Sequence, residues 1–439
     1  MTRSVNATPE TTTTRRNFLK ATAAAAGAAA IGPLVFTGNL HAAGSDVIKL
    51  GLIGAGDRGT GAAIQALKAD KGARLVAMAD VFADRLQASR SEIKGAVADQ
   101  MAVDDGHCFV GFDAYQKVID SGVDAILIAC ASRYHPIYLK AGIAAGKHVF
   151  VEKPHAIDPP GVKVVQEACE EAKRKNLCVV SGLHRRYDPA VQETMKRILD
   201  GAIGEIVAAE VSFMRTPYKI VNRDPKWSEM EWQFRTWYHF SYLSGDDVPQ
   251  SLIHTLDTAT QALREESPVS AHGLAGRSAS IATIYGDVFD HHTVVYEYAS
   301  GVQVYGLLRT QNDCHGEVEV KLFGTKGRAT EGSITGPVNW RYEGKNPGGH
   351  QQEQTEFMAA LRAGKVINNG DYMVRSTLNT VLGQMACYTG RKVAYKEAAE
   401  CKFTYPPKDG RIDFTIDPPV KPDANGIYPV PVPGRSRWA

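Results

Sequence analysis

The sequence predicts an α/β protein of two domains, and three observations carry this prediction. Apolar, strand-like runs alternate with helical patterns between residues 47 and 183, which is typical of a doubly wound parallel sheet. A glycine-rich turn follows the first of these runs, as in Rossmann domains. From residue 203 onward, strand patterns recur without that alternation, which indicates an α+β domain with an open, mostly antiparallel sheet. A chain of 439 residues is long enough for both.

The first 43 residues have the features of an export signal. The paired arginines of RRNFLK (15–20) precede a run of small, weakly apolar residues, and HAAG (41–44) offers small residues for cleavage. The arginine pair indicates the twin-arginine route, so we expect a periplasmic or otherwise exported protein. The alternative is a membrane anchor, which needs about 20 strongly apolar residues. Because this run is mostly Ala and Gly, we expect no membrane association once the signal is removed.

The overall charge balance argues against nucleic acid as a partner. Removing residues 1–43 takes away four of the 50 basic side chains and one of the 48 acidic ones, which leaves 46 against 47. A nearly neutral chain without a basic run is not expected to bind nucleic acid. The seven cysteines show no CxxC or Cys/His spacing, so we expect no metal site, and one disulfide remains an open alternative.

The turn after VIKLGLI (47–53) has the glycine pattern of a dinucleotide site. Strand, turn and helical pattern follow one another in the order that such a site needs. The glycines permit a tight bend, let the main chain approach a pyrophosphate and let helix pack on strand, while the helix N-terminus faces the phosphates. The cofactor contacts predicted in this turn are Gly54, Gly56, Asp57, Arg58 and Gly59.

The second strand, RLVAMAD (74–80), ends in a carboxylate that selects the cofactor. Asp80 lies 21 residues after Gly59, where it can accept both ribose hydroxyls and would repel a 2′-phosphate. NAD is therefore favoured over NADP, although the nearby Arg85 keeps NADP open. The alternative is a glycine turn in a nucleotide-free domain, and the strand, the spacing and the acid together argue against it.

Three more strands are expected over 124–130, 147–154 and 177–183. In a doubly wound sheet the ligand lies beyond the carboxyl ends of the strands. We therefore predict cofactor contacts from the residues at these ends, which are Ser132, His135, Glu152, Lys153 and His184, and substrate contacts from Arg186 and Tyr187.

The segment GKHVFVEKP (146–154), placed after a dinucleotide domain, resembles the Gfo/Idh/MocA family of oxidoreductases, and the order of the later motifs extends the resemblance over nearly the whole mature chain. The resemblance implies that Lys153 lies between nicotinamide and substrate and that Glu152 lies by the nicotinamide ribose. The residues agree, because a lysine at the end of such a strand can stabilise the alkoxide-like charge that develops as hydride leaves. The alternative is a solvated surface lysine.

A second motif is SGDDVPQSLIHTLDTATQAL (244–263), in which Gln250, His254 and Asp257 share one face of a helical pattern. The family pattern implies that His254 is the acid/base residue. Better-known members carry Asp where this chain has Gln250, and an amide cannot take a proton. His254 then works without that carboxylate, or Asp247 or Asp257 serves instead. The alternative for His254 is a satisfied core histidine.

Two further segments supply candidates for the substrate pocket. DPKWSEMEWQFRTWYHFSYL (224–243) is rich in aromatic residues that suit either a sugar's C–H face or a core, and the resemblance places Trp237 and Tyr238 near nicotinamide and substrate. The pair His291-His292 lies in an expected strand, where neighbours point to opposite faces, so one metal ion cannot easily take both. We predict that one of them lines the substrate cleft.

The organisation follows from these patterns: a signal over 1–43, a nucleotide domain over 44–183, a substrate and oligomerisation domain over 184–400 and a proline-rich arm over 401–439. Two helical patterns, HQQEQTEFMAALRAG (350–364) and RSTLNTVLGQMACYTG (375–390), are expected beside the antiparallel sheet. The resemblance implies a homodimer or homotetramer. We expect the arm to wrap on a neighbouring subunit or to be loosely ordered.

Export and a nucleotide site together restrict the function. An exported enzyme has no cytoplasmic NADH pool, so it must keep its NAD bound and restore it within each cycle. One scheme is a sugar oxidoreductase, with Lys153 and His254 handling the hydroxyl proton while NAD takes the hydride. A second is redox-assisted cleavage of a glycosidic bond, and a third is a non-catalytic sugar sensor. The retained Glu-Lys-Pro favours the oxidoreductase.

Overall fold

The computed structural model describes residues 47–407 and 413–438. The predicted export signal lies outside this part of the chain. Within it, no helix is both long and apolar enough to cross a membrane. All seven cysteines are free thiols.

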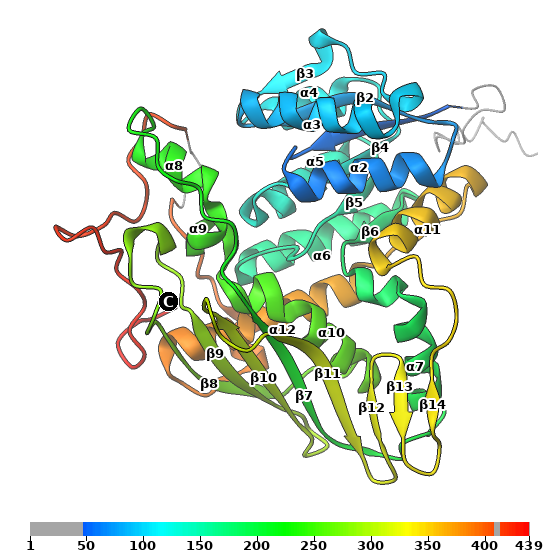
Figure 1. The fold of residues 1–439 in the computed structure, drawn as a ribbon, viewed down its shortest axis with the longest axis vertical. Helices are drawn as coiled ribbons and strands as arrows, with labels where there is room; N and C mark the ends of the chain where they lie inside the picture. The colour runs from blue at the N-terminus through cyan, green and yellow to red at the C-terminus, as the bar shows by residue number, and fades with distance from the viewer. Residues whose placement is uncertain (1–46, 408–412, 439) are drawn as a thin grey trace, which may run out of the picture. The chain divides into compact units, whose positions relative to one another are not determined.

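The N-terminal domain is the predicted doubly wound sheet. Its six strands pair in parallel in the order β3-β2-β1-β4-β5-β6, and helices cover both faces (Figure 1). The strands are β1 (Ile48–Ile53), β2 (Ala73–Asp80), β3 (Cys108–Val110), β4 (Ala125–Ile128), β5 (His148–Val151) and β6 (Val179–Ser181). The helices are α2 (Asp57–Ala69), α3 (Ala83–Ala96), α4 (Ala114–Asp120), α5 (His135–Ala144) and α6 (Pro159–Arg174). The chain reverses its direction across the sheet between β1 and β4, which is where such sheets bind ligands.

Two glycines of the turn after β1 are required by close contacts. Gly54 has φ +95°, and a Cβ there would lie 2.5 Å from the main-chain nitrogen of Cys130. A Cβ at Gly59 would lie 1.9 Å from the main-chain oxygen of Gly54. These contacts bring α2 directly against the ends of β1 and β4, as the glycine pattern predicted.

The C-terminal domain contains a nine-stranded sheet in the order β14-β13-β12-β11-β7-β10-β9-β8-β15, antiparallel except for the β7–β10 pair. The central strands are β7 (Ile206–Arg215), β8 (Ser270–Gly276), β9 (His291–Glu297), β10 (Gln303–Thr310) and β11 (Glu317–Gly324). The edge strands are β12 (Arg328–Thr330), β13 (Ser333–Thr335), β14 (Trp340–Arg341) and β15 (Val393–Ala394). The predicted α+β class is confirmed.

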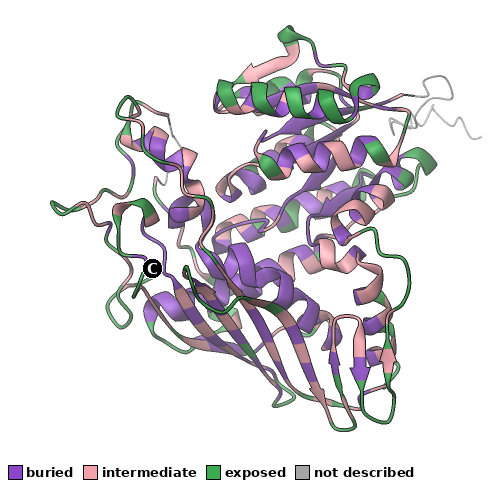
Figure 2. Cartoon of the chain, viewed as in Figure 1, coloured by how far each residue is buried: buried purple, intermediate pink, exposed green. Residues whose placement is uncertain are grey.

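Helices cover one face of this sheet and join it to the first domain. The helices that pack on the sheet are α7 (Pro189–Leu199), α10 (Ile253–Ala262) and α12 (Gly370–Thr389). The other helices of this part of the chain are α8 (Glu229–Arg235), α9 (Ser241–Ser244), α11 (Gly349–Ala363) and α13 (Tyr395–Glu400). The helix α12 packs on β8, β9 and α6 and is almost wholly buried, whereas β9 buries every second residue (Figure 2). The opposite face of the sheet is therefore only half covered within one chain.

The helix α11 packs differently from expectation. It was expected beside the antiparallel sheet, but it packs on α2 of the nucleotide domain (Figure 1).

The described residues of the C-terminal arm contact their own chain. Arg133 donates to the main-chain oxygens of Tyr405, Pro406 and Pro407 at 2.8–3.2 Å. The expected contact of the arm with a neighbouring subunit stays a prediction.

Candidate active site

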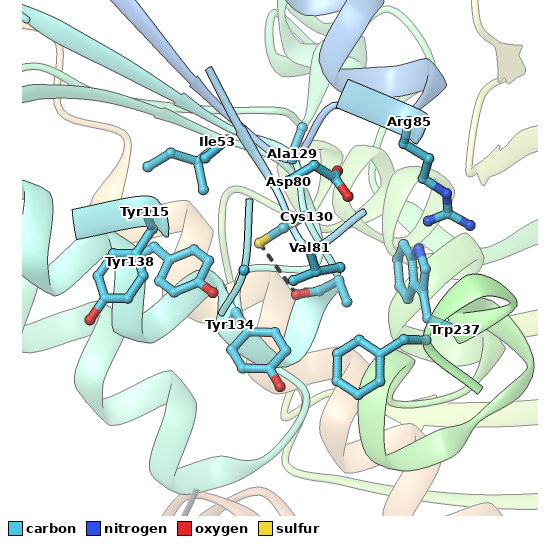
Figure 3. A pocket seen from close by; sticks show the side chains of 16 residues that line it. Ile53, Asp80, Val81, Arg85, Tyr115, Ala129, Cys130, Tyr134, Tyr138 and Trp237 are labelled. Atoms are coloured by element: carbon cyan, nitrogen blue, oxygen red, sulfur yellow. Dashed lines mark hydrogen bonds between the residues drawn. The ribbon is translucent and has the colours of Figure 1, made fainter. Parts of the chain in front are cut away.

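A cavity of about 620 Å³ opens beyond the carboxyl ends of β1, β2 and β4 (Figure 3). Its walls include Gly54, Gly56, Asp80 and Arg85 from the nucleotide domain and Trp237 from the other domain. A Cβ at Gly56 would meet no atom within 4 Å, so the main chain is open to a ligand there. The N-terminus of α2 has no side-chain cap, which leaves its N–H groups for phosphate oxygens.

Asp80 lies in the middle of this cavity and is held by the main chain (Figure 3). Its Oδ2 accepts from the Ala55 N–H at 2.8 Å and its Oδ1 from the Phe82 N–H at 2.9 Å. Burial raises the pKa of its carboxyl, and these two hydrogen bonds oppose that shift. The remaining lone pairs of a carboxylate suit a ribose diol, so the residues present fit an NAD cofactor.

The ends of β5 and α2 place three charged side chains together. Lys153 Nζ donates to the main-chain oxygen of Gln250 at 2.7 Å, which directs it toward the second domain. Glu152 is buried, and its Oε1 lies 2.8 Å from Arg58 Nε. Arg58 of the glycine turn thus neutralises the carboxylate that precedes the predicted catalytic lysine.

Three histidine rings lie in one row beside this group. The His184 and His254 centroids are 4.7 Å apart in an edge-on arrangement, and His184 stacks on His350 at 3.8 Å. Burial, with the nearby charge of Lys153, holds the pKa of His254 well below its usual range. Burial likewise lowers the pKa of His184 to about 2 and that of His350 to about 3. These rings are therefore neutral near pH 7.

Sequence reasoning missed His350 and Glu353, which come from α11. Glu353 is fully buried, and its Oε1 lies 3.3 Å from His350 Nδ1. Burial and then the charge of Glu152 raise the pKa of Glu353 well above the usual range. Ligand atoms of Glu152, His350 and Glu353 lie within 4.8 Å of one another, a spacing that a metal ion could bridge. Their spacing in the sequence gives no signal, because α11 joins them only through its packing on α2.

The residues that were predicted to replace the family's carboxylate have other partners. Gln250 Nε2 donates to Ser132 Oγ and to the Ser244 main-chain oxygen, both at 2.7 Å, so its amide ties the two domains together. Asp247 accepts from Arg215 at 2.7 Å and from Ser251 Oγ at 2.8 Å. Neither side chain bonds His254, whose Nδ1 is buried without a hydrogen-bond partner among the described residues.

Asp257 and two predicted substrate contacts form a structural network. Asp257 accepts from Arg186 Nε and Nη2 at 2.8 Å, and Arg186 also pairs with Glu265. The Tyr187 hydroxyl donates to Asn369 Oδ1 at 2.8 Å. Arg186 and Tyr187 thus have internal partners because the chain after His184 turns into the protein, and their contact with substrate stays a prediction.

His135 and the pair on β9 also have internal roles. The two ring nitrogens of His135 lie 2.7 Å and 3.0 Å from the main-chain oxygens of Pro154 and Cys130, which fixes the loop after β5. His291 and His292 face opposite sides of β9, as predicted. His292 is buried 3.6 Å from Asp246, and half-exposed His291 bonds Asp290 at 2.7 Å. In these contacts neither joins the group around Lys153.

Trp237 and Tyr238 lie where the two domains meet. Their rings stack at 3.8 Å, Tyr238 stacks on Tyr218 at 3.8 Å, and the Arg215 guanidinium lies 3.5 Å from the Tyr218 ring centroid. Trp237 lines the cofactor cavity, whereas Tyr238 and Tyr218 line a second cavity of about 280 Å³ that also contains Asp247. The aromatic stack therefore separates two cavities.

The fold, the glycine turn and Asp80 define an NAD-dependent oxidoreductase. Family models confirm this: residues 48–181 match the oxidoreductase family with an NAD-binding Rossmann fold, and residues 191–330 match the GFO/IDH/MocA C-terminal domain. The chain belongs to the Gfo/Idh/MocA family.

Its relatives include inositol 2-dehydrogenase of Rhizobium meliloti (strain 1021), which is 28% identical over 283 residues, 64% of this chain and 74% of that protein. The myo-inositol 2-dehydrogenase of Thermotoga maritima is 28% identical over 286 residues, with the same coverage. Among solved structures, aldose-aldose oxidoreductase from Caulobacter crescentus has a TM-score of 0.61 at 18% identity over 79% of this chain and 99% of that chain. Levoglucosan dehydrogenase in complex with NADH and levoglucosan has a TM-score of 0.61 at 17% identity over 80% and 99%. At these identities the two structures show a shared fold.

Proposed function

We propose that this protein is an exported sugar or polyol oxidoreductase that transfers hydride between a secondary hydroxyl and a bound NAD, which is regenerated within the catalytic cycle. The observation that carries the proposal is that Lys153, at the end of β5, reaches the second domain at Gln250, four residues before His254, whose pKa its charge helps to lower. The names of its relatives, inositol dehydrogenases, support a polyhydroxylated substrate.

Bound NAD supplies the hydride acceptor. The residues of this chain handle the proton and the charge. The Lys153 ammonium donates a hydrogen bond to the reacting oxygen and stabilises negative charge there. His254 enters the cycle neutral, since burial and Lys153 depress the pKa of its ring, and it takes the hydroxyl proton at a ring nitrogen. Arg58 forms an ion pair with Glu152, so the Lys153 ammonium does not have to pair with that carboxylate.

The domain interface supplies side chains that suit a sugar or polyol. The faces of Tyr218 and Tyr238 suit the C–H surface of a sugar ring, and Asp247 offers a hydrogen-bond acceptor in the same cavity. A buried apolar face with a few polar groups is the usual composition of a small-molecule site. The stack next to Trp237 places this cavity directly beside the cofactor cavity.

The test of the catalytic proposal is Lys153→Met, with Lys140→Met on the exposed side of α5 as control. Loss of a positioned proton donor costs about 10²- to 10⁴-fold in rate. We expect kcat/KM toward inositols and aldoses to fall by about that factor, with NAD binding retained. Equal activity in Lys153→Met and wild type would contradict the role of Lys153, whereas absence of turnover in the wild type itself would favour a sugar sensor.

Retention and export have separate tests. Protein purified without added nucleotide is denatured, and its supernatant is analysed by mass spectrometry for NAD(H) and NADP(H). Near-stoichiometric NAD supports the retained cofactor, whereas empty protein contradicts it.

Export is tested by cell fractionation. We expect the Arg15→Lys, Arg16→Lys double variant to accumulate inside the cell while wild type reaches the periplasmic fraction.

Redox-assisted glycoside cleavage is the second candidate. The aromatic faces of Tyr218 and Tyr238 beside the cofactor cavity suit a second sugar unit attached to the oxidised one. Products separate the candidates: a ketosugar or lactone indicates net oxidation, and a shortened glycan indicates cleavage.

A further inference from the structure

The C-terminal arm, meaning described residues 401–407 and 413–438, forms part of an aromatic cluster next to the cofactor cavity. Phe414 of the arm stacks on Phe82 with ring centroids 5.2 Å apart and planes 6° apart. It also contacts Phe112 at 5.0 Å and Phe234 at 5.8 Å, both edge-on. Phe112 and Phe234 contact each other at 5.1 Å. One ring of the arm thus joins three rings from three other parts of the chain.

Each of those three rings is tied to a wall of the cavity. Phe234 lines the cavity itself. Phe82 follows the lining residue Val81 and donates its N–H to Asp80, and Phe112 follows the lining residue Gly111. Phe82 and Phe112 come from the nucleotide domain, whereas Phe234 comes from α8. Phe414 therefore connects the two sides of the cavity near Asp80.

Charged groups reinforce the same junction. The Arg235 guanidinium lies 4.0 Å from the Phe82 ring centroid and donates to Asp84 Oδ2 at 2.9 Å. Arg85, which lines the cavity, donates to the Arg235 main-chain oxygen at 2.5 Å (Figure 3). The arm adds main-chain contacts, since Ser228 Oγ donates to the Phe414 oxygen at 2.8 Å and Gln233 Nε2 to the Val420 oxygen at 2.9 Å.

The arm is also fixed on either side of Phe414. Arg133, next to the cavity residue Tyr134, holds the main chain of residues 405–407. Further along, Trp438 stacks on Phe403 at 4.4 Å and packs against Tyr388 and Tyr405. These rings are not those that Phe414 contacts, so the far end of the arm is anchored separately from the Phe414 cluster.

We infer that Phe414 is a positioning residue that keeps the cofactor cavity closed on the side of Asp80, so that the dinucleotide leaves only after the arm releases its contacts. This inference rests on the proposed function, because slow release of the cofactor is needed only if NAD stays bound and is regenerated within the catalytic cycle. Phe414 need not touch the cofactor. It acts by keeping Phe82, Phe112 and Phe234 together, and loss of its ring lets the two sides of the cavity separate.

The test compares Phe414→Ala with Trp438→Ala, which removes an aromatic ring from the same arm at a site away from the cavity. Holoprotein is loaded with isotopically labelled NAD and chased with excess unlabelled NAD, and the label remaining on the protein is followed by mass spectrometry. Thermal unfolding of each variant is recorded alongside. We expect Phe414→Ala to release NAD about tenfold faster than wild type or more, since each aromatic contact is worth a factor of about two to ten. We expect Phe414→Tyr to restore slow release and Trp438→Ala to leave it unchanged.

The outcomes separate this inference from the proposed function. Release from Phe414→Ala at the wild-type rate would overturn the inference, and so would equal acceleration in Trp438→Ala, since the ring would then act only through general stability. Rapid release from wild type itself would contradict the retained cofactor. The ratio between Phe414→Ala and wild type would still decide the role of Phe414.

Discussion

The predicted site residues divide into those that meet at the reaction centre and those that support it. Lys153, Glu152, His184 and His254 converge from the ends of β5 and β6 and from α10. Arg186 lies only two residues from His184, yet it binds Asp257. Residue type and position in the chain cannot distinguish a reaction-centre residue such as His184 from a supporting residue such as Arg186. The direction in which a side chain points at a strand end depends on partners that are far away in the sequence. Their roles in the reaction stay predictions.

Glu353 offers a residue-scale prediction because burial and the charge of Glu152 raise the pKa of its carboxyl, which favours the protonated form. Glu353→Gln replaces a neutral acid by a neutral amide of similar shape, so thermal stability and activity should stay close to wild type. Glu353→Ala should instead lower stability by about 2–5 kcal/mol through a cavity and the loss of the His350 contact. Chemical denaturation measures the free energy of unfolding of each variant. A larger loss in the Gln variant than in the Ala variant would mean that the carboxyl is ionised or binds a cation.

At the scale of elements, the packing of α2 on the glycine turn predicts how two glycine substitutions change the affinity for NAD. Gly59→Ala would place a Cβ 1.9 Å from the Gly54 main-chain oxygen, so α2 must move away from β1 and the phosphate site opens. Gly61→Ala on the same helix meets only Arg58 Nη1, at 3.7 Å. We expect NAD affinity to fall at least about tenfold in Gly59→Ala and to stay unchanged in Gly61→Ala. Isothermal titration of the apoprotein checks both, and equal affinities would contradict this account.

The helix α10 carries His254 and depends on the buried pair of Arg186 and Asp257, whose side chains are 10% and 1% exposed. Removing one partner strands a buried charge, so Arg186→Met should cost about 3–5 kcal/mol in the free energy of unfolding. Lys173→Met breaks the exposed pair with Asp371 and should cost less than about 1 kcal/mol. Urea denaturation distinguishes them. A small loss in Arg186→Met would show that the network is dispensable for α10.

The elements themselves were largely predictable, whereas their long-range packing was not. Strands such as β1 and β4 are local apolar runs beside glycine turns, and those signals need no tertiary context. The pattern of α11 is that of an ordinary amphipathic helix, so nothing in it indicates that it brings His350 and Glu353 to Glu152. The contacts of the proline-rich arm were not predictable either, since the half-buried ring of Phe414 finds partners more than 170 residues away.

At the scale of the whole molecule, several buried histidines make stability depend on pH. Burial lowers the pKa of His135 to about 4 and those of His155 and His350 to about 3, against 6.5 for an ordinary imidazole. Below pH 6.5 the unfolded chain therefore binds protons that the folded chain does not, and the folded state loses stability as pH falls. Burial also lowers the pKa values of His184, His239 and His254. Four carboxyls act in the opposite direction, because burial raises the pKa of Asp287 to about 6 and raises those of Asp80, Asp158 and Glu353. The six histidines outnumber these four groups, so the net change is a loss.

This imbalance predicts that the free energy of unfolding decreases from pH 7.5 to pH 5.5, by about 1.4 kcal/mol per pH unit for each net proton taken up. Urea denaturation at intervals across this range measures the slope. His155 bonds the hydroxyls of Ser181 and Thr377 away from the proposed reaction centre, so His155→Gln should reduce the slope by one proton while leaving activity intact. An unchanged slope in this variant would mean that the folded protein takes up the proton on His155, which would require the contact between β6 and α12 to loosen in acid.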